Sequence, residues 1–184
     1  MRGIWLGLLL CACSGSSDNE VDGSVAGFSL SARDAIFFQH NGRQLVVISN
    51  QDDICRKLDR QTLGEVHLLE LHLWDASTTD GGTLAEGTYV VSGDASNPSL
   101  QSQVYFGVAS SCAPFSIAWF RAASGQVILL HSGANQPGER TQVAFRLNFG
   151  NELLAGHADA VYCRLPSTGS IGCIQEGSFA QPSP

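Results

Sequence analysis

The feature that most restricts the fold is a long alternating hairpin near the C-terminal end of the sequence. Gly150-Asn151 separates residues 141–149 from residues 152–162, and glycine at the first central position suits a type II′ turn. Apolar and polar residues alternate on both segments, which predicts two antiparallel strands with one buried and one solvated face. Counting outward from the turn predicts these pairs: Phe149–Glu152, Leu147–Leu154, Phe145–Gly156 and Val143–Ala158.

Two further dipeptides indicate tight turns between short β-type segments. Asn41-Gly42 separates residues 35–39 from residues 44–49, because asparagine and glycine tolerate the positive φ of a type I′ turn. Ser124-Gly125 separates residues 117–122 from residues 127–131, which would place Trp119 beside Leu130 across a hairpin. The remaining expected strands cover residues 25–29, 65–74, 87–91 and 103–109.

One short helix is expected over residues 52–60, with Asp52 or Asp53 capping its first turn. Ile54 and Leu58 lie four residues apart, so both can face a sheet. Roughly nine strands at short spacing then predict an all-β fold, either a single antiparallel β-sandwich or a closed barrel. The choice between sandwich and barrel stays open at this point.

The N-terminal residues are predicted to form a targeting segment. Arg2 precedes an apolar run from Ile4 to Leu10, which is about half of the roughly 20 residues that a membrane-spanning helix needs. Residues 1–12 are therefore interpreted as a signal peptide. Residues 13–23 are polar and small and are expected to form a flexible tether, residues 24–180 the domain, and residues 181–184 a frayed tail.

Four cysteines remain in the expected domain: Cys55, Cys112, Cys163 and Cys173. An even number in an exported chain favours two disulfides, and the absence of a Cys-x-x-Cys spacing argues against zinc. Cys163 has the strand parity of the solvated face, so its partner should lie over that face, as the residue 52–60 segment would. This reasoning favours Cys55–Cys163 with Cys112–Cys173, and leaves a local Cys163–Cys173 bond as the alternative.

Charge and motifs exclude several function classes. The chain has 17 acidic and 10 basic residues, with Lys57 as its one lysine, so it lacks the basic surface that nucleic acid binding needs. No common motif of a hydrolase nucleophile, metalloprotease or calcium loop is present, and no cofactor is expected. An extracytoplasmic hydrolase with dispersed residues stays the alternative, with Glu65, Glu70, Asp75 and Asp80 as loose carboxylate candidates.

The most suggestive segment for ligand binding is the expected strand over residues 65–74. Its core face carries Leu69, Leu71 and Leu73, and its opposite face carries Glu70, His72 and Trp74. An indole beside a carboxylate and an imidazole offers a sugar an apolar surface and polar groups that fix its orientation. The alternatives are that Trp74 packs on a small apolar cluster, or that Asp75 and Asp80 hold calcium.

Leu10-Cys11-Ala12-Cys13 resembles the lipobox of bacterial lipoproteins, in which a small residue precedes the acylated cysteine. Cys13 fits this pattern because Ala12 precedes it, whereas Leu10 precedes Cys11; secretion without acylation is the alternative. Ser14 is not acidic, which by the same resemblance implies the outer membrane.

The C-terminal hairpin, Phe145-Arg-Leu-Asn-Phe-Gly with Leu154-Ala-Gly and Ala160-Val-Tyr-Cys163, resembles uncharacterised lipoproteins of Gram-negative bacteria. That family implies a β-sandwich-like domain and no assigned activity, whereas the Gly-x-Trp signature of lipocalins is missing near Gly27-Phe28. The expectation is a lipid-anchored, non-catalytic binding or interaction module, held at the membrane by acyl chains and recognising an envelope protein or glycan.

Overall fold

The computed structural model describes residues 19–40, 43–60, 62–75, 83–91, 100–111 and 117–164. These residues form eleven strands and one helix, which confirms the all-β fold class. The elements in chain order are β1 Glu20–Val25, β2 Phe28–Ser29, β3 Asp34–His40, β4 Arg43–Ser49, α1 Ile54–Asp59, β5 Val66–Asp75, β6 Gly87–Val91, β7 Leu100–Ala109, β8 Ile117–Arg121, β9 Ser124–His131, β10 Arg140–Phe149 and β11 Glu152–Tyr162.

Eight of the strands close into a barrel, which decides between the two expected architectures. The strand order is β10-β9-β6-β7-β5-β4-β3-β11, and β11 pairs back with β10. Two of these pairings are parallel, β6 with β7 and β11 with β3, so the barrel is mixed and not purely antiparallel. The three extra strands extend it: β1 pairs with β11, β2 with β1, and β8 with β7.

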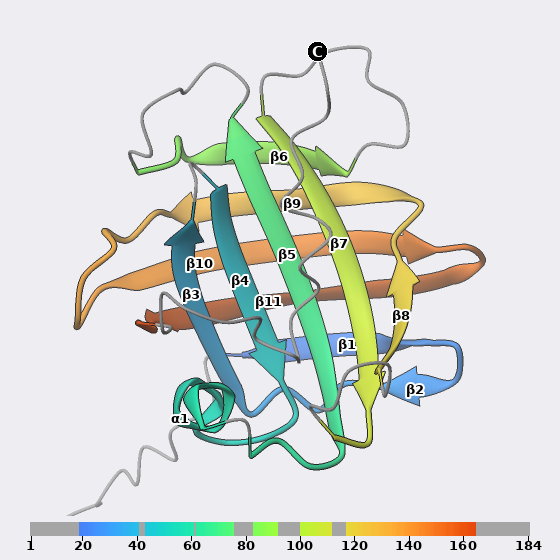
Figure 1. Ribbon diagram of the computed structural model, residues 1–184. Helices are drawn as coiled ribbons and strands as arrows, with labels where there is room; N and C mark the ends of the chain where they lie inside the picture. The colour runs from blue at the N-terminus through green and yellow to red at the C-terminus, as the bar shows by residue number, and fades with distance from the viewer. Residues whose placement is uncertain are drawn as a thin grey trace, which may run out of the picture.

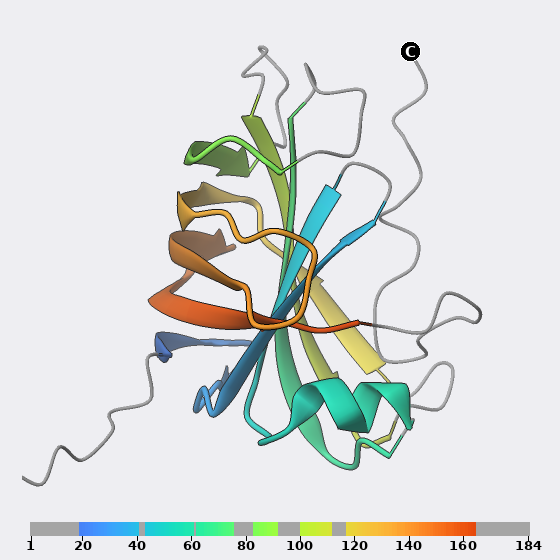
Figure 2. The ribbon, with the colours of Figure 1, turned by 90° about the vertical axis from the view of Figure 1, so that its left-hand side faces the viewer.

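The barrel is flattened into two layers whose strands cross (Figure 1). The first layer contains β3, β4, β5 and β7, and the second contains β1, β6, β9, β10 and β11. The parallel pairings are the corners at which the hydrogen-bonded sheet passes from one layer to the other, as the side view also shows (Figure 2).

Side chains fill the space between the layers. Phe37, Tyr89 and Phe106 are fully buried there, together with the leucines that β5 directs inward. An eight-stranded barrel is just wide enough for its own side chains, so a core of this size leaves the interior packed.

A polar link crosses this interior between the layers. Gln44 on β4 and Thr141 on β10 are both fully buried. Gln44 Nε2 donates to Thr141 Oγ1 at 2.7 Å, and the Ser132 hydroxyl donates to Gln44 Oε1 at 3.2 Å. Thr141 Oγ1 also accepts from the Gly133 N–H at 3.1 Å. Pairing of this kind offsets the cost of burying polar groups and ties β4 to β10 in one arrangement.

Two of the three predicted hairpins are confirmed. β10 and β11 pair in the predicted register from Phe149–Glu152 outward, with Phe145 opposite Gly156. β3 and β4 pair so that His40 faces Arg43, and the turn residues Asn41 and Gly42 lie outside the described residues.

The third predicted hairpin is wrong. β8 pairs with β7, where Trp119 lies opposite Gly107 and not beside Leu130, while β9 pairs with β10 and β6. Gly125 lies inside β9 with a φ of 140°, and a side chain there would overlap the Arg146 carbonyl oxygen of β10. Close backbone approach and a tight turn both require glycine, so the local pattern did not distinguish them.

The domain begins earlier than the sequence suggested. Residues 20–23, assigned to the tether, belong to β1 and pair with residues 154–157 of β11. The Asp159 N–H donates to the Asn19 side-chain oxygen at 2.9 Å, which extends this contact by one residue. Main-chain hydrogen bonds thus order a polar segment that has little apolar surface of its own. The strand expected over residues 25–29 is divided by a turn at Ala26-Gly27.

The helix is confirmed over Ile54–Asp59, and its buried residues are Ile54 and Leu58 as expected. The predicted capping is wrong, because Asp53 at the N-cap makes no side-chain capping hydrogen bond. The Asp34 carboxylate on β3 accepts from the Ile54 N–H at 2.9 Å instead. Asp34, which is distant in sequence, therefore accepts the hydrogen bond that a neighbouring N-cap side chain normally accepts.

The disulfide between Cys55 and Cys163 is present, with a Cα–Cα distance of 5.7 Å, and it joins α1 to the end of β11. The predicted Cys112–Cys173 bond lies outside the described residues. The same holds for the expected signal peptide, for Cys11 and Cys13, and for the expected tail over residues 181–184.

Candidate functional site

The three residues predicted to bind a ligand, Glu70, His72 and Trp74, share one side of β5 on the outer face of the first layer. Leu69, Leu71 and Leu73 face the core, as predicted. Strand pairing adds neighbours on the outer face. These are Val47 and Tyr105 beside Glu70, Leu45 and Gln103 beside His72, and Arg43 and Gln101 beside Trp74. We refer to Arg43, Glu70, His72, Trp74 and Tyr105 as the β5 cluster.

Two members of the β5 cluster are shielded from solvent. Glu70 is 0% exposed and His72 is 1% exposed. His72 Nε2 lies 3.1 Å from Glu70 Oε2, and the His72 ring packs edge-on against Tyr105 at 5.5 Å between centroids. Buried ionisable groups are tolerated in pairs of this kind. The structure therefore brings the predicted residues together but leaves two of them out of reach of a glycan at the surface.

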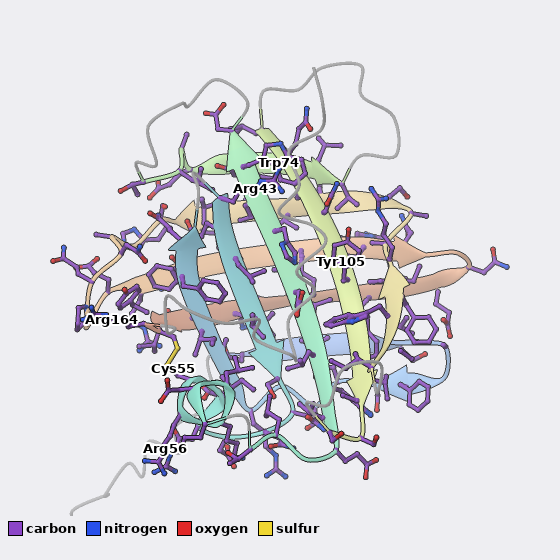
Figure 3. All side chains as sticks on the ribbon, in the orientation of Figure 1. Arg43, Cys55, Arg56, Trp74, Tyr105 and Arg164 are labelled. Atoms are coloured by element: carbon purple, nitrogen blue, oxygen red, sulfur yellow. A yellow bond between two sulfur atoms is a disulfide. The ribbon has the colours of Figure 1, made fainter. Side chains whose placement is uncertain are left out.

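Trp74 is half-buried and has a partner that sequence reasoning missed (Figure 3). The Arg43 guanidinium carbon lies 5.0 Å from the centre of the indole ring. Burial lowers the pKa of Arg43 below its ordinary value, while nearby Tyr105 acts in the opposite direction. A guanidinium over an indole is a cation–π contact, so one face of the ring is occupied within the chain. The sequence prediction left Arg43 between the turn and the strand expected over residues 44–49, whereas Arg43 begins β4 and the β4–β5 register pairs it with Trp74.

The three carboxylate candidates for hydrolysis that the structure describes, Glu65, Glu70 and Asp75, do not form a pair. Glu65 precedes β5, Glu70 lies in its middle, and Asp75 ends it. Side chains five residues apart on a strand point to opposite faces, so Glu70 faces away from Glu65 and Asp75. Glu65 and Asp75 share a face, but they are ten residues apart, which is about 33 Å along a strand. Asp80, the fourth candidate, lies outside the described residues.

Asp75 lies near a buried phenol on β6. The Tyr89 hydroxyl donates to the Ala85 carbonyl at 2.7 Å. Burial raises the pKa of Tyr89 to about 12, and the negative charge of Asp75 adds to the rise. Tyr89 is therefore a neutral donor at physiological pH. Within the described ranges, no group of three histidine, cysteine or acidic side chains is placed to hold a metal ion.

The other histidines are separated from the β5 cluster. His67 points to the opposite face of β5, where its Nδ1 lies 2.7 Å from the Ser29 carbonyl oxygen. His131 Nδ1 lies 3.4 Å from a Glu86 carboxylate oxygen at the surface. His157 is exposed on β11, and the His40 side chain lies outside the description.

A shallow groove of about 390 Å³ lies on the outer face of the second layer, where sequence reasoning expected only a solvated surface. It is lined by Leu130, Gln142, Val143, His157, Ala158 and Asp159. Leu130 points outward by the alternation of β9, in which Val127 and Leu129 are buried, and it is 54% exposed. The register shifts next to it, because His131 pairs with Gln142 and Leu129 with Val143, so Leu130 itself has no paired residue on β10.

The same outer face carries further exposed aliphatic side chains. Val90 on β6, Leu153 on β11 and Val161 on β11 join Leu130. Ile128 and Ala144 form a cross-strand pair between them. The charged residues are Glu20 and Asp22 on β1, Arg146 on β10, and the ion pair of Arg140 with Asp159 at 2.8 Å. We call this outer face of the second layer the partner face.

No helix in the described part of the chain is long and apolar enough to cross a membrane. No protein-family model, curated protein or solved structure matches this chain.

Proposed function

We propose that this protein is a lipid-anchored envelope protein whose barrel is a non-catalytic module that binds a protein partner. The observation that carries the proposal is the contrast between a packed interior and an exposed, partly aliphatic partner face. A barrel that carries a small ligand keeps space for it in the interior. Here the interior is occupied by side chains, among them Phe37, Tyr89 and Phe106. Recognition is therefore assigned to the outside of the barrel.

The partner face has the composition of a protein-binding surface. Leu130 stands in a groove with Gln142 and His157 at its sides, so an apolar contact would be combined with hydrogen-bonding groups. Contiguous exposed apolar surface with a polar rim is typical of interaction sites. The strands beneath it are paired on both sides over most of their length, which makes the surface preorganised.

The proposed anchor is an acyl-modified Cys13. Because Asn19 already contacts β11, residues 14–18 would be the tether, and the six residue steps from Cys13 to Asn19 span at most about 20 Å when fully extended. An acylated Cys13 would thus hold the domain close to the membrane surface. The support for acylation is the lipobox-like Leu10-Cys11-Ala12-Cys13 pattern.

Replacing Cys13 with serine should release the protein from membranes, because the acyl chains that supply the membrane affinity can no longer be attached. The measurement is fractionation of Gram-negative cells with metabolic labelling by a fatty acid. Cys11→Ser is the matched control and should leave labelling and membrane association unchanged. Continued labelling of the Cys13→Ser protein would mean that the anchor is elsewhere.

Leu130→Asp should weaken binding of a partner by about tenfold or more, because it puts a charge at the apolar centre of the groove. A photo-reactive residue placed at position 130 of the membrane-bound protein should give one discrete adduct with an envelope protein, which then supplies the purified ligand for affinity measurement. Ala118→Asp adds the same charge on the exposed strand β8 and should not change the affinity. Equal losses in both variants would refute the assignment of the partner face.

A further inference from the structure

Strand β8 lies at an edge of the first layer and is paired on one side. It forms an antiparallel ladder with β7, in which Ile117 lies opposite Ala109 and Arg121 opposite Tyr105. No other described strand pairs with β8, and Figure 1 shows none beyond it in this layer. Within the described part of the chain, one side of the β8 backbone is therefore unpaired.

The ladder identifies the backbone groups on the unpaired side. The Ala122 N–H, directly after β8, donates to the Val104 carbonyl of β7 at 3.0 Å. Hydrogen-bonded and non-hydrogen-bonded pairs alternate along an antiparallel ladder, so the even-numbered residues of β8 bond to β7. The N–H and C=O groups of the odd-numbered residues point away from β7, and no hydrogen bond joins them to another described residue. These residues are Ile117, Trp119 and Arg121.

We propose that this free edge of β8 binds an extended segment of a different protein, which adds to the first layer as a further β-strand. Unpaired N–H and C=O groups along a sheet edge are matched by the backbone of another strand, because the groups of both strands have the same spacing. The edge belongs to the first layer and the partner face to the second. The inference therefore goes beyond the proposed function and does not depend on it.

The sequence of β8 lacks the features that usually protect an edge strand. Such strands commonly carry lysine, proline, a bulge or a charge directed inward. β1, near the other end of the strand order, carries Glu20 and Asp22 and has a positive φ at Gly23. The sequence of β8 is Ile-Ala-Trp-Phe-Arg, and it pairs with β7 without a register shift. Its backbone is therefore suited to accept another strand.

The side chains of β8 favour an apolar segment. Ile117 and Trp119 pack against the α1 cluster on the outer side of the layer, and Phe120 packs against the main core on the inner side. All three are partly exposed, so apolar side chains of an added strand can extend the contact on both sides. Trp119 is fixed in position, because its ring lies over Gly107 of β7, where a Cβ atom would overlap it.

Arg121 determines the charge that fits this edge. Its side chain is exposed and forms no ion pair with another described residue. A carboxylate on the added strand, opposite Arg121, would form a cross-strand ion pair. β8 itself contains no acidic residue, so the same edge of a second copy cannot supply this carboxylate. The ligand is therefore an apolar strand with an acidic residue, from a different protein.

The test uses an acetylated six-residue peptide of alternating valine and threonine with one glutamate as the probe. Hydrogen exchange of backbone amides in the full chain is followed by NMR. Without peptide, the amides of Ile117, Trp119 and Arg121 should exchange rapidly, whereas those of Ala118 and Phe120 should be protected by β7. Saturating peptide should slow exchange of the first three by about tenfold or more. No slowing at these positions with millimolar peptide would overturn the proposal.

Two controls separate strand addition from non-specific binding. Ile117→Pro removes an outward donor and no ladder bond to β7, so it should weaken peptide binding by about tenfold, whereas Ile117→Val keeps the N–H and should bind as the parent chain does. A peptide with lysine in place of glutamate should also bind the parent chain more weakly. Unchanged binding in both comparisons would contradict the proposal. Self-association of the full chain that Ile117→Pro abolishes would assign the edge to a second copy instead.

Discussion

Replacing Phe145 with alanine should lower the free energy of unfolding by about 3–5 kcal/mol. Phe145 lies in the middle of β10, is 5% exposed, and belongs to the main core between the layers. Its ring packs over Gly156 on β11, which has no side chain of its own to fill the space. Truncation would therefore leave a cavity in the centre of the barrel as well as remove buried apolar surface.

Neighbouring Gly156 limits how far the structure can relax into that cavity. A Cβ atom at position 156 would overlap the Glu20 carbonyl oxygen of β1, so the two backbones are already in close contact. The measurement is urea unfolding followed by circular dichroism, and the matched control is Arg146→Ala, which removes an outward side chain from the next position of β10. Equal destabilisation by both variants would show that Phe145 has no special place in the core.

Removing both cysteines of the Cys55–Cys163 bond, as the Cys55→Ala/Cys163→Ala protein, should cost about 2–5 kcal/mol of stability. The bond links residues 108 apart in sequence, so its loss frees a long loop in the unfolded chain. It also joins α1, which has only two buried residues, to the strand that closes the barrel. Both cysteines are replaced so that neither thiol is left free to react.

The readout is the denaturant midpoint, with the slope of the transition compared between proteins. Asp59→Ala, an exposed change on the same helix, is the control and should have little effect. A midpoint unchanged in the double variant would mean that packing of Ile54 and Leu58 alone secures α1, and that the bond contributes little.

Features specified by the period-two alternation of a strand could be predicted from the sequence. The β10–β11 register follows from a two-residue turn and a period-two pattern, since a slip by one residue would expose the row of Phe145, Leu147 and Phe149. The Cys55–Cys163 pairing followed from the same parity, because Cys163 had to meet something lying over the outer side. In each case few alternatives satisfy both the local geometry and the burial of apolar side chains.

The errors arose where a local pattern fits two tertiary contexts. Glycine at position 125 is compatible with a turn and also with the close approach of β9 to β10. In the structure it allows the close approach. The polar residues 20–23 have the composition of a tether, yet they form β1 because β11 presents an edge for pairing. Neither the edge that β11 presents nor the close approach of β9 to β10 can be recognised from the sequence around residues 20–23 or around Gly125.

The sequence by itself determined the all-β class, the side of β5 on which Glu70, His72 and Trp74 lie, and the pairing of β3 with β4 and of β10 with β11. Only the tertiary structure decided that the sheet closes through two parallel pairings, that Arg43 stacks on Trp74, and that Glu70 and His72 are buried. The physical reason is that alternation specifies which residues share a face, whereas closure and burial depend on contacts between segments far apart in the chain.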